Sequence, residues 1–362
     1  MPSRTKIYCF TKYSAKGPSS RYRTFQYLPF WSKYYDLEVN ILMDDWYFDS
    51  NTNIITKAIK YLSSFRKRLT VISSIKNRDI VWIEYELFPY FGSFAERYLK
   101  RKGIPIVFDY DDAIFHNYDN HKWIFIRMLF GSKIKRLLQM SAGVITGSPY
   151  LTEYAKKFNK HIIEIPTSLN LSQYFLNEPL IDKVRSDIFV IGWLGSKSTS
   201  VNLILIRDAI KDFTANVKAE LWLMGFDETK RDLWKGLPVR FFNWTTETEK
   251  SFLASIDVGI MPLLDTPFRH GKCGFKLIQY MAMGKPTIST PMEANIKIDK
   301  AKINYFANNQ KEWEESFRYI YKNLSMYNFS LNREIVAEFY NSTVNEAAYR
   351  ILFEKLIKKT EN

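Results

Sequence analysis

A glycine-rich basic loop between two apolar segments is the feature of this sequence most suited to chemistry. The loop reads GKCGFK at residues 271–276 and is preceded by Arg269 and His270. The strand-like run DVGIMPLL at 257–264 comes before it, and a helix is predicted from about 275 to 283. Backbone N–H groups and the positive end of a helix attract anions, so this order of elements is typical of phosphate sites. A solvated basic loop between two core strands is the alternative interpretation.

Two lysines add positive charge to this region. Lys276 and Gln279 are three residues apart, which places them on one face of the predicted helix, and Lys272 lies in the loop before it. A second turn of this kind follows the apolar run that ends in Gly195-Ser196. Positive potential fixed at such turns would favour a bound phosphate, because the N–H donors and the helix end are already in place.

Three aspartates, Asp109, Asp111 and Asp112, stand at the end of the apolar run 104–109. An aspartate pair of this kind occurs in metal sites, and in phosphatases of the haloacid-dehalogenase type, although Ala113 breaks the latter pattern. An aspartate that caps the next helix is the plainest interpretation. Three carboxylates in four residues would raise one another's pKa if buried together, which favours a site that meets a hydroxyl or a cation.

Other nucleotide-binding and metal-binding patterns are absent from the sequence. The segments 192–198 and 283–287 lack the spacing of a phosphate-binding P-loop, and Gly17 stands alone where a dinucleotide fingerprint would need three glycines. The four histidines show no ligand spacing, and Cys9 and Cys273 make no metal or disulfide pattern. We therefore predict neither a metal nor a bound cofactor.

Strand-like runs alternate with helix-length segments, which is typical of parallel-sheet α/β domains. The predicted strands of the first half are 6–10, 37–42, 80–84, 104–109, 143–146 and 162–166. The predicted strands of the second half are 189–194, 219–224, 239–242, 257–264 and 287–290, with a helix at 201–213. A polar segment, 168–186, predicts a hinge between the halves. A chain of 362 residues is long enough for two domains that each bury a core.

The basic charge is unevenly distributed along the chain. Residues 1–180 hold 26 basic and 16 acidic side chains, whereas residues 181–362 hold 26 and 22. The excess is densest in two amphipathic stretches, 54–72 and 123–140, with basic faces at Lys57 to Arg68 and Lys133 to Arg136. Such stretches either cover a sheet with their apolar face, which is the safer interpretation, or rest on an anionic lipid leaflet. The two interpretations are compatible if only the charged edge meets lipid.

Location and partners follow from what the sequence lacks. It has no apolar run of about 18 residues or more and no signal-peptide pattern at its N-terminus. We therefore expect a cytoplasmic protein, peripheral on the inner face of the membrane if its basic faces bind lipid. A basic nucleic-acid-binding protein without enzymatic activity is the alternative of another class, but no recognised nucleic-acid motif supports it.

The segment around the basic loop resembles the donor-binding signature of family-4 glycosyltransferases, in a bacterial branch that reads approximately MPL-D-P---GKCGFK-LQYMA-G-P. The matching positions here are Met261, Pro262, Leu263, Asp265, Pro267, 271–276, 277–282, Gly284 and Pro286. Further matches at 16–23, 107–115, 147–154 and 191–196 extend the resemblance over most of the chain. Two glutamates that most of the wider family pairs fall at Gly271 and Gln279, and Ser196 replaces an arginine.

The resemblance implies the GT-B architecture, in which two Rossmann-like domains face a cleft. The acceptor domain would span 1–180 and the donor domain 181–335. The last helix, within 336–362, would pack back on the N-terminal domain. The implied activity is metal-independent, retaining transfer of a sugar from a nucleotide-diphosphate sugar, most commonly a UDP-sugar. The acceptor would be a glycan or a lipid-linked glycan in surface polysaccharide or glycoconjugate synthesis, and a protein acceptor is the alternative.

The resemblance also assigns roles to individual residues. Asp111 and Lys276 are the predicted catalytic residues, and Gln279 is expected at the ribose or sugar. The predicted donor phosphate ligands are Gly195, Ser196, Arg269, Lys272, Gly274 and Lys276. The predicted acceptor-side residues are Gly17, Arg21, Arg23, Glu84 and Asp112.

Overall fold

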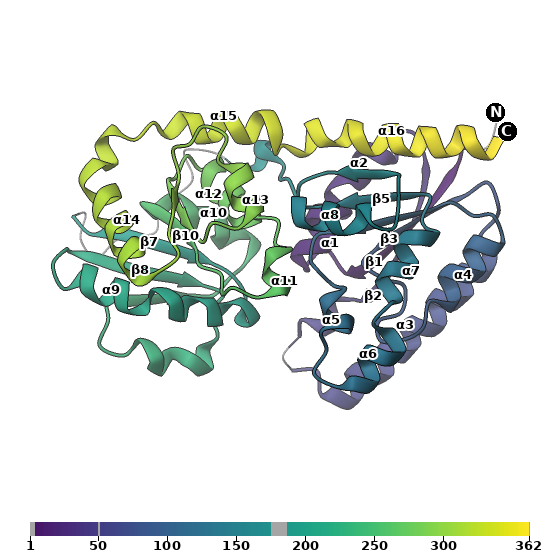
Figure 1. Cartoon of the computed structure of the whole chain (residues 1–362), viewed down its shortest axis with the longest axis horizontal. Coiled ribbons are helices and arrows are strands. Elements are labelled where there is room, and N and C mark those ends of the chain that lie inside the picture. The colour runs from purple at the N-terminus through teal and green to yellow at the C-terminus, as the bar shows by residue number, and fades with distance from the viewer. Residues whose placement is uncertain (1–3, 50, 175–186, 362) are drawn as a thin grey trace. The chain divides into compact units, whose positions relative to one another are not determined.

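The computed structural model describes residues 4–49, 51–174 and 187–361, which form two compact units (Figure 1). Unit 1 comprises Met1–Ser168, His270–Cys273 and Ser342–Asn362, and unit 2 comprises Leu169–Arg269 and Gly274–Asn341. Each unit has a parallel six-stranded sheet, so the α/β prediction is confirmed.

The sheet of unit 1 has the strand order β2-β1-β3-β4-β5-β6. Its strands are β1 (Lys6–Tyr13), β2 (Asp36–Met43), β3 (Ile80–Glu84), β4 (Ile106–Tyr110), β5 (Gly143–Thr146) and β6 (Ile162–Glu164). Every residue of β3, β4 and β5 is buried, as expected for central parallel strands with both faces covered. Their sequences are therefore mostly apolar runs, which is why two of these strands were predicted with their observed bounds.

The C-terminal helix completes the core of unit 1. The helices of this unit are α1 (Pro18–Arg23), α2 (Leu28–Trp31), α3 (Ile54–Ser74), α4 (Phe94–Arg101), α5 (His116–Asp119), α6 (Ile124–Phe130), α7 (Lys133–Met140), α8 (Pro149–Lys156) and α16 (Ser342–Glu361). On α16, the Phe353 ring lies 5.3 Å from the Trp31 ring and 5.8 Å from the Trp82 ring. A Cβ at Gly143 would lie 2.9 Å from the Leu352 side chain, so a glycine in β5 lets this helix approach the sheet.

The apolar stripe of α3 does not cover the sheet, and the expectation that it would is wrong. Ile55, Ile59 and Leu62 are exposed, whereas the buried residues of the helix are Arg68 and Ile72. The guanidinium of Arg68 explains this orientation, because it donates to backbone oxygens of three other segments of unit 1 and to the side chain of one of them. A buried charge that makes four hydrogen bonds is tolerated, although burial lowers the pKa of Arg68 to about 9.

The sheet of unit 2 has the strand order β12-β11-β10-β7-β8-β9. Its strands are β7 (Phe189–Leu194), β8 (Ala219–Met224), β9 (Val239–Phe242), β10 (Val258–Met261), β11 (Thr287–Ser289) and β12 (Tyr305–Phe306). The first strand of this unit, β7, lies at the centre of the sheet, with β8 on one side and β10 on the other. The strand order therefore reverses between β7 and β10, the place where doubly wound sheets bind ligands.

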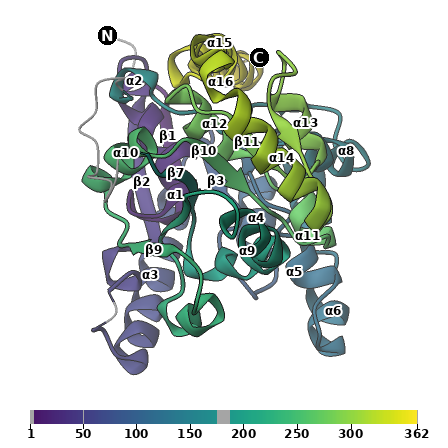
Figure 2. The same cartoon turned by 90° about the vertical axis from the view of Figure 1, so that its left-hand side faces the viewer.

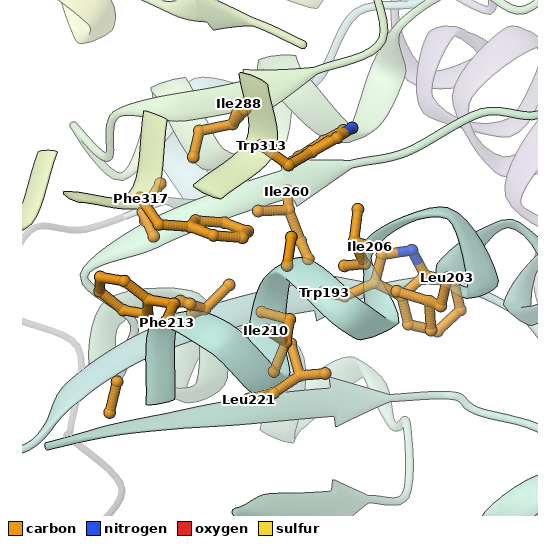
Figure 3. Packing of buried hydrophobic residues seen from close by; sticks show 14 of the residues in the cluster. Trp193, Leu203, Ile206, Ile210, Phe213, Leu221, Ile260, Ile288, Trp313 and Phe317 are labelled. Atoms are coloured by element: carbon orange, nitrogen blue, oxygen red, sulfur yellow. The ribbon is translucent and has the colours of Figure 1, made fainter. Parts of the chain in front are cut away.

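Helices α9 and α14 cover the core of unit 2. The helices of this unit are α9 (Arg207–Thr214), α10 (Thr246–Ser255), α11 (Pro267–His270, whose last residue belongs to unit 1), α12 (Phe275–Ala282), α13 (Glu293–Ile298), α14 (Gln310–Asn323) and α15 (Phe329–Phe339). Figure 3 shows Phe213 of α9 and Phe317 of α14 close together, to the left of Ile260 of β10. The two phenylalanine rings are 5.6 Å apart. This packing holds the sheet whose carboxyl edge carries the predicted donor residues.

Three local predictions are wrong in their secondary structure. The stretch predicted as one helix at 201–213 is a 3-10 segment, Lys197–Ile206, followed by α9. The amphipathic stretch 123–140 is two helices, α6 and α7, that meet at Gly131 and Ser132. The loop expected at 16–23 is mostly α1, which starts at Pro18, where a fixed φ and a missing N–H suit the first helical position.

Two predictions concern the connections between the units. The predicted hinge, 168–186, lies largely outside the described residues, which resume at Asp187. The C-terminal segment predicted at 336–362 contains the end of α15 in unit 2 and α16 in unit 1. Among the described residues, no helix combines the length and apolar character that crossing a membrane requires.

Candidate functional site

The carboxyl edge of the unit 2 sheet gathers several of the predicted donor residues. Gly195 and Ser196 follow β7, and the segment after β10 leads through Arg269 to α12. Because β7 and β10 are neighbours, these two turns lie side by side at the point where the strand order reverses. The fold therefore brings together the two turns that the sequence identified separately.

Gly274 starts α12 in a conformation that favours glycine. It is the N-cap residue, with a φ of 66°. A Cβ here would lie 2.3 Å from Ile298 and 2.9 Å from the side-chain oxygen of Asn295. Both the backbone and the space therefore require glycine. Since α12 follows β10, its positive end lies at the carboxyl edge of the sheet, where an anion would gain from it.

Lys276 lies over the ring of Trp193, with 5.9 Å between its Nζ atom and the ring centroid. The same ring explains Gly195, because a Cβ at that position would lie 2.0 Å from a Trp193 carbon atom. The indole is buried and belongs to the core of unit 2. The ammonium group of Lys276 therefore lies above a buried and rigid aromatic ring.

The N–H groups of Gly195 and Ser196 are bonded within the protein. The Gly195 N–H donates to the Met224 carbonyl at 3.0 Å, and the Ser196 N–H donates to Thr199 Oγ1 at 3.0 Å. The expectation that these two groups offer their hydrogens to a phosphate is wrong for this structure. What remains at the edge is the start of α12, Lys276 and Arg269, whose pKa is lowered by burial.

A buried carboxylate that the sequence did not identify lies beside Gln279. Glu249 on α10 accepts a hydrogen bond from Gln279 Nε2 at 2.8 Å, from Tyr174 at 3.2 Å and from the Trp244 indole at 2.6 Å. A carboxylate only accepts, so it fixes the Gln279 amide with its NH2 group inward. The amide oxygen is then the atom of Gln279 that a ligand hydroxyl would meet. The signal for Glu249 in the sequence was weak, because it lies 30 residues from its partner.

Four residues of the basic loop belong to unit 1 rather than to unit 2. In this segment, His270–Cys273, Lys272 forms an ion pair with Asp112 at 2.7 Å, and Cys273 Sγ lies 2.9 Å from the Asp111 carbonyl. Burial opposes the charge of Lys272, but Asp112 raises its pKa above the ordinary value. In this structure the Asp112 carboxylate holds the ammonium group of Lys272, and phosphate binding by Lys272 stays a prediction.

Two glycines let this segment pack closely in unit 1. A Cβ at Gly271 would lie 2.5 Å from Ala113, and a Cβ at Gly147 would lie 2.5 Å from Cys273 Sγ. The wider glycosyltransferase family places a glutamate at the position of Gly271. A side chain of that size does not fit against Ala113 in this packing. The departure from the wider pattern thus has a steric reason.

Asp111 is bonded by a tyrosine in an unusual conformation. Tyr85 directly follows β3 and is buried, with a φ of 63° in the left-handed region that few residues other than glycine adopt. Its hydroxyl donates to Asp111 Oδ1 and lies 2.9 Å from Ser19 Oγ. Burial raises the pKa of Asp111, and the neighbouring charge of Asp112 raises it further. Strained backbone of this kind is frequent at functional sites.

Two predicted acceptor-side residues are structural. Arg23 and Glu84 are about 1% exposed, so neither can meet an acceptor, and their assignment to the acceptor side is wrong. Arg23 donates to Asp109 at 2.5 Å and 3.1 Å and to the Ile165 carbonyl at 2.6 Å. Burial alone would lower the pKa of Arg23, but the paired Asp109 raises it above its ordinary value. Burial raises the pKa of Asp109 to about 6.

Glu84 ties α1 to the end of β3. Its carboxyl group accepts from Ser20 Oγ at 2.6 Å and from Thr24 Oγ1 at 3.2 Å. Burial raises the pKa of Glu84 to about 8. Gly17 and Arg21 shape the loop before α1. A Cβ at Gly17 would lie 2.4 Å from Tyr13, and Arg21 donates to two backbone oxygens of that loop.

The three aspartates of unit 1 contact different partners. Asp109 binds Arg23, Asp111 accepts from Tyr85 and Asp112 pairs with Lys272. The metal interpretation of this cluster requires them to face one ion instead. Within residues 4–49, 51–174 and 187–361, no group of three or more histidine, cysteine or acidic side chains is arranged to hold a metal.

Two comparisons with known protein sequences concern the family of this chain. Residues 186–323, more than a third of the chain, match the family described as "Glycosyl transferases group 1". The chain is 26% identical over 259 residues to the putative teichuronic acid biosynthesis glycosyltransferase TuaH of Bacillus subtilis. That alignment covers 66% of this chain and 62% of TuaH, so it spans less than two thirds of that relative.

Solved structures match almost the whole chain. Sucrose-phosphate synthase from Thermosynechococcus elongatus has a TM-score of 0.71 at 12% identity, with 98% of this chain and 100% of that chain covered. Anabaena HepE in complex with UDP-glucose has a TM-score of 0.68 at 13% identity, with 98% and 99% covered. The chain therefore has the GT-B fold, and residues 186–323 match the group 1 glycosyltransferase family.

Proposed function

We propose that the protein is a glycosyltransferase that moves a sugar from a nucleotide-diphosphate sugar to a glycan or lipid-linked glycan acceptor in surface polysaccharide or glycoconjugate synthesis. The observation that carries this proposal is the carboxyl edge of unit 2, where the start of α12 and Lys276 meet the turn after β7 within a group 1 glycosyltransferase domain. TuaH, whose name refers to teichuronic acid biosynthesis, supports a glycan acceptor. HepE, solved with UDP-glucose, supports a UDP-sugar donor.

The proposed chemistry depends on stabilising the leaving diphosphate without a metal. The positive end of α12, Lys276 and Arg269 supply positive potential at the edge where the diphosphate would lie. The Trp193 ring under Lys276 limits the motion of the ammonium group, so less order has to be gained as charge develops. The Gln279 amide oxygen, oriented by Glu249, accepts a hydroxyl of the ribose or sugar. Transfer with retention of configuration is the stereochemical outcome that we expect.

Asp111 is the proposed catalytic residue of unit 1. Its raised pKa and its bond to Tyr85 suit a carboxyl group that exchanges a proton or a hydrogen bond with a sugar hydroxyl. Asp112 and Lys272 form the neighbouring pair, which holds the 270–273 segment in place. Arg21 and Gly17 shape the loop on the acceptor side.

Two other functions receive less support from the structure. Transfer to a protein acceptor would need the same donor site. Only identification of the product distinguishes a protein acceptor from a glycan acceptor. Nucleic-acid binding rested on the basic charge of residues 1–180. Two of those charges, Arg68 and Lys133, are buried and bonded inside unit 1, so no nucleic-acid partner is proposed. We place the enzyme in the cytoplasm, on the inner face of the membrane.

A donor screen tests the proposed function. The protein is incubated with UDP-, GDP- and dTDP-sugars, with and without a lipid-linked glycan fraction, and released nucleotide diphosphate is measured. We expect release with one donor, stimulated by the acceptor fraction, and a product labelled by the sugar of that donor. Absence of release with every donor, together with no thermal stabilisation by any nucleotide diphosphate, would contradict the proposal. A ligand at 100-fold its dissociation constant should stabilise the fold by about 2.7 kcal/mol.

A further inference from the structure

Unit 1 exposes two clusters of large apolar side chains. On the first half of α3, Ile55, Ile59 and Leu62 are 62–70% exposed. On α6, Phe125, Met128 and Leu129 are 66–76% exposed, and their neighbours Trp123 and Ile124 are more than half exposed. Exposed apolar residues scattered singly are ordinary, but clusters such as these mark an interaction surface.

Within the two segments that carry these clusters, every charged side chain is positive. The chain has no Asp or Glu between Asp49 and Asp79, or between Asp119 and Glu153. The exposed basic residues within these two segments are Lys60, Arg66, Lys67, Lys76, Arg78, Lys122, Arg127, Lys135 and Arg136. Apolar side chains surrounded by lysine and arginine are the composition of interfacial helices that rest on anionic bilayers.

A buried cation lies on the inward side of α3, and another lies at the start of α7, the helix that follows α6. Arg68 holds α3 through backbone oxygens of unit 1, and Lys133, at the start of α7, pairs with Glu86 and donates to the Phe88 carbonyl. The earlier expectation that Arg68 and Lys133 themselves bind lipid is therefore wrong. The large apolar side chains of both clusters, on α3 and on α6, face outward.

The two clusters lie at the same end of unit 1. Figures 1 and 2 show the start of α3 and the whole of α6 at the lower end of this unit, apart from each other in the second view. A surface that contacts both would therefore be broad rather than a groove. A bilayer has this shape, and its anionic headgroups complement the basic residues between the two clusters.

We propose that this end of unit 1, defined by residues 54–69 and 122–129, is a lipid-binding surface whose apolar side chains enter an anionic bilayer. This inference rests on the proposed function in one respect, the lipid-linked acceptor, which a membrane-bound enzyme would meet at the bilayer surface. It differs from binding by charge alone, because insertion of Ile59, Leu62, Phe125 and Leu129 would survive salt that screens the lysines.

The test compares three variants in vesicle flotation. The insertion variant carries Ile59→Ser, Leu62→Ser, Phe125→Ser and Leu129→Ser, and the charge variant carries Lys60→Gln, Lys67→Gln and Lys122→Gln. The matched control carries Met326→Ser and Ile351→Ser, which are 82% and 61% exposed and lie elsewhere in the chain. Vesicles of phosphatidylcholine alone are compared with an equimolar mixture of phosphatidylcholine and phosphatidylglycerol, at low and high salt. Circular dichroism and nucleotide binding without vesicles show that each variant is folded.

The wild type and the matched control should bind the anionic vesicles, and part of that binding should persist in high salt. We expect the insertion variant to lose about tenfold or more in vesicle affinity at either salt concentration. The charge variant should lose the salt-sensitive part only. Wild-type binding by the insertion variant, or no binding of the wild type to anionic vesicles, would overturn the proposal. A dimer in solution that the insertion variant abolishes, without vesicle binding, would identify a second copy as the partner and also overturn it. Nucleotide binding that persists in either case shows that only the lipid surface has failed, not the proposed function.

Discussion

Gln279 donates its side-chain amide to the buried carboxylate of Glu249 across 2.8 Å. The wider glycosyltransferase family has a glutamate at the position of Gln279. The structure shows why this chain does not, because a carboxylate already occupies the adjacent space from α10. Two unpaired carboxylates so close together inside the protein would repel strongly.

This relationship predicts a compensating pair of substitutions. Gln279→Glu alone should lower the free energy of unfolding by about 2 kcal/mol or more at neutral pH, because a second buried negative charge has no partner. The double variant Gln279→Glu, Glu249→Gln restores one carboxylate and one amide, so it should recover most of the loss. Urea denaturation of the wild type, Gln279→Glu, Glu249→Gln and the double variant measures the coupling. Equal stability of the single and double variants would contradict this account of the pair.

The same pair should influence donor affinity. Glu249→Gln removes the group that fixes the Gln279 amide, so the amide can turn its NH2 group to the ligand. We expect a higher KM for the nucleotide sugar with little change in kcat. The interaction would be lost equally in the ground state and in the transition state. An unchanged KM in a folded variant would show that Glu249 does not orient the site.

Tyr85 should tune the pH profile of transfer through Asp111. Its hydrogen bond favours the ionised carboxylate, so Tyr85→Phe should raise the pKa of Asp111 further and move the pH–rate profile toward higher pH. Asp111→Asn should lower turnover by about 100-fold with nucleotide binding intact. Full activity of Asp111→Asn would remove this residue from the mechanism, and an unmoved profile in Tyr85→Phe would separate Tyr85 from it.

Glu84 gives the fold a pH dependence of defined sign. Burial raises its pKa from 4.5 to about 8, so the folded protein holds a proton that the unfolded chain releases in that interval. Stability should therefore fall as pH rises toward 8, by the order of 1 kcal/mol per pH unit. Asp109, with a pKa of about 6, acts in the same direction at lower pH, so the test for Glu84 is made between pH 6 and 8.

The variant Glu84→Gln carries no titrating group and can still bond Ser20 and Thr24. Its stability should be nearly flat across that range, whereas the exposed Glu315→Gln should behave as the wild type. Thermal unfolding at several pH values makes the comparison. A wild-type slope in Glu84→Gln would mean that another group titrates.

Replacing Gly274 should cost stability for two reasons, its backbone conformation and its close packing. A second glycine, Gly236, allows the two costs to be measured separately. Gly236 also has a positive φ, 83°, but nothing lies within 4 Å of a Cβ built there. Gly236→Ala should therefore cost about 1 kcal/mol for the backbone alone. Gly274→Ala adds the clash with Ile298 and should cost about 2 kcal/mol or more and weaken nucleotide binding. Equal costs at the two positions would contradict the packing at the start of α12.

The strands were predictable because of their burial. Runs such as 80–84, 189–194 and 219–224 are mostly apolar, as is typical of central parallel strands, and β3, β7 and β8 have these bounds. The orientation of α3 was not predictable, because an apolar stripe shows its own periodicity but not which surface it faces. Only the acceptors around Arg68, distant in sequence, decide that.

The loops of the site were predictable from the sequence, but the contacts between residues distant in sequence were not. The spacing of glycines and lysines indicated the start of α12 correctly, since that signal is local. The partner of Lys272 is Asp112, 160 residues away, and no local pattern reveals such a contact. The capping of Ser196 by Thr199 was visible only as two hydroxyl residues three apart, a pattern too common to be specific.

Calorimetric titration of UDP into the wild type, Lys276→Ala and Lys311→Ala tests the central claim most directly, with GDP and dTDP as reference ligands. Lys311 lies on α14 with its side chain 83% exposed, so it controls for the loss of a positive charge from unit 2. We predict binding of one nucleotide diphosphate, weakened about tenfold or more by Lys276→Ala and unchanged in Lys311→Ala, with turnover reduced about 100-fold by Lys276→Ala. Equal binding by the three proteins, or half of the wild-type turnover in Lys276→Ala, would contradict the donor site described at the start of α12.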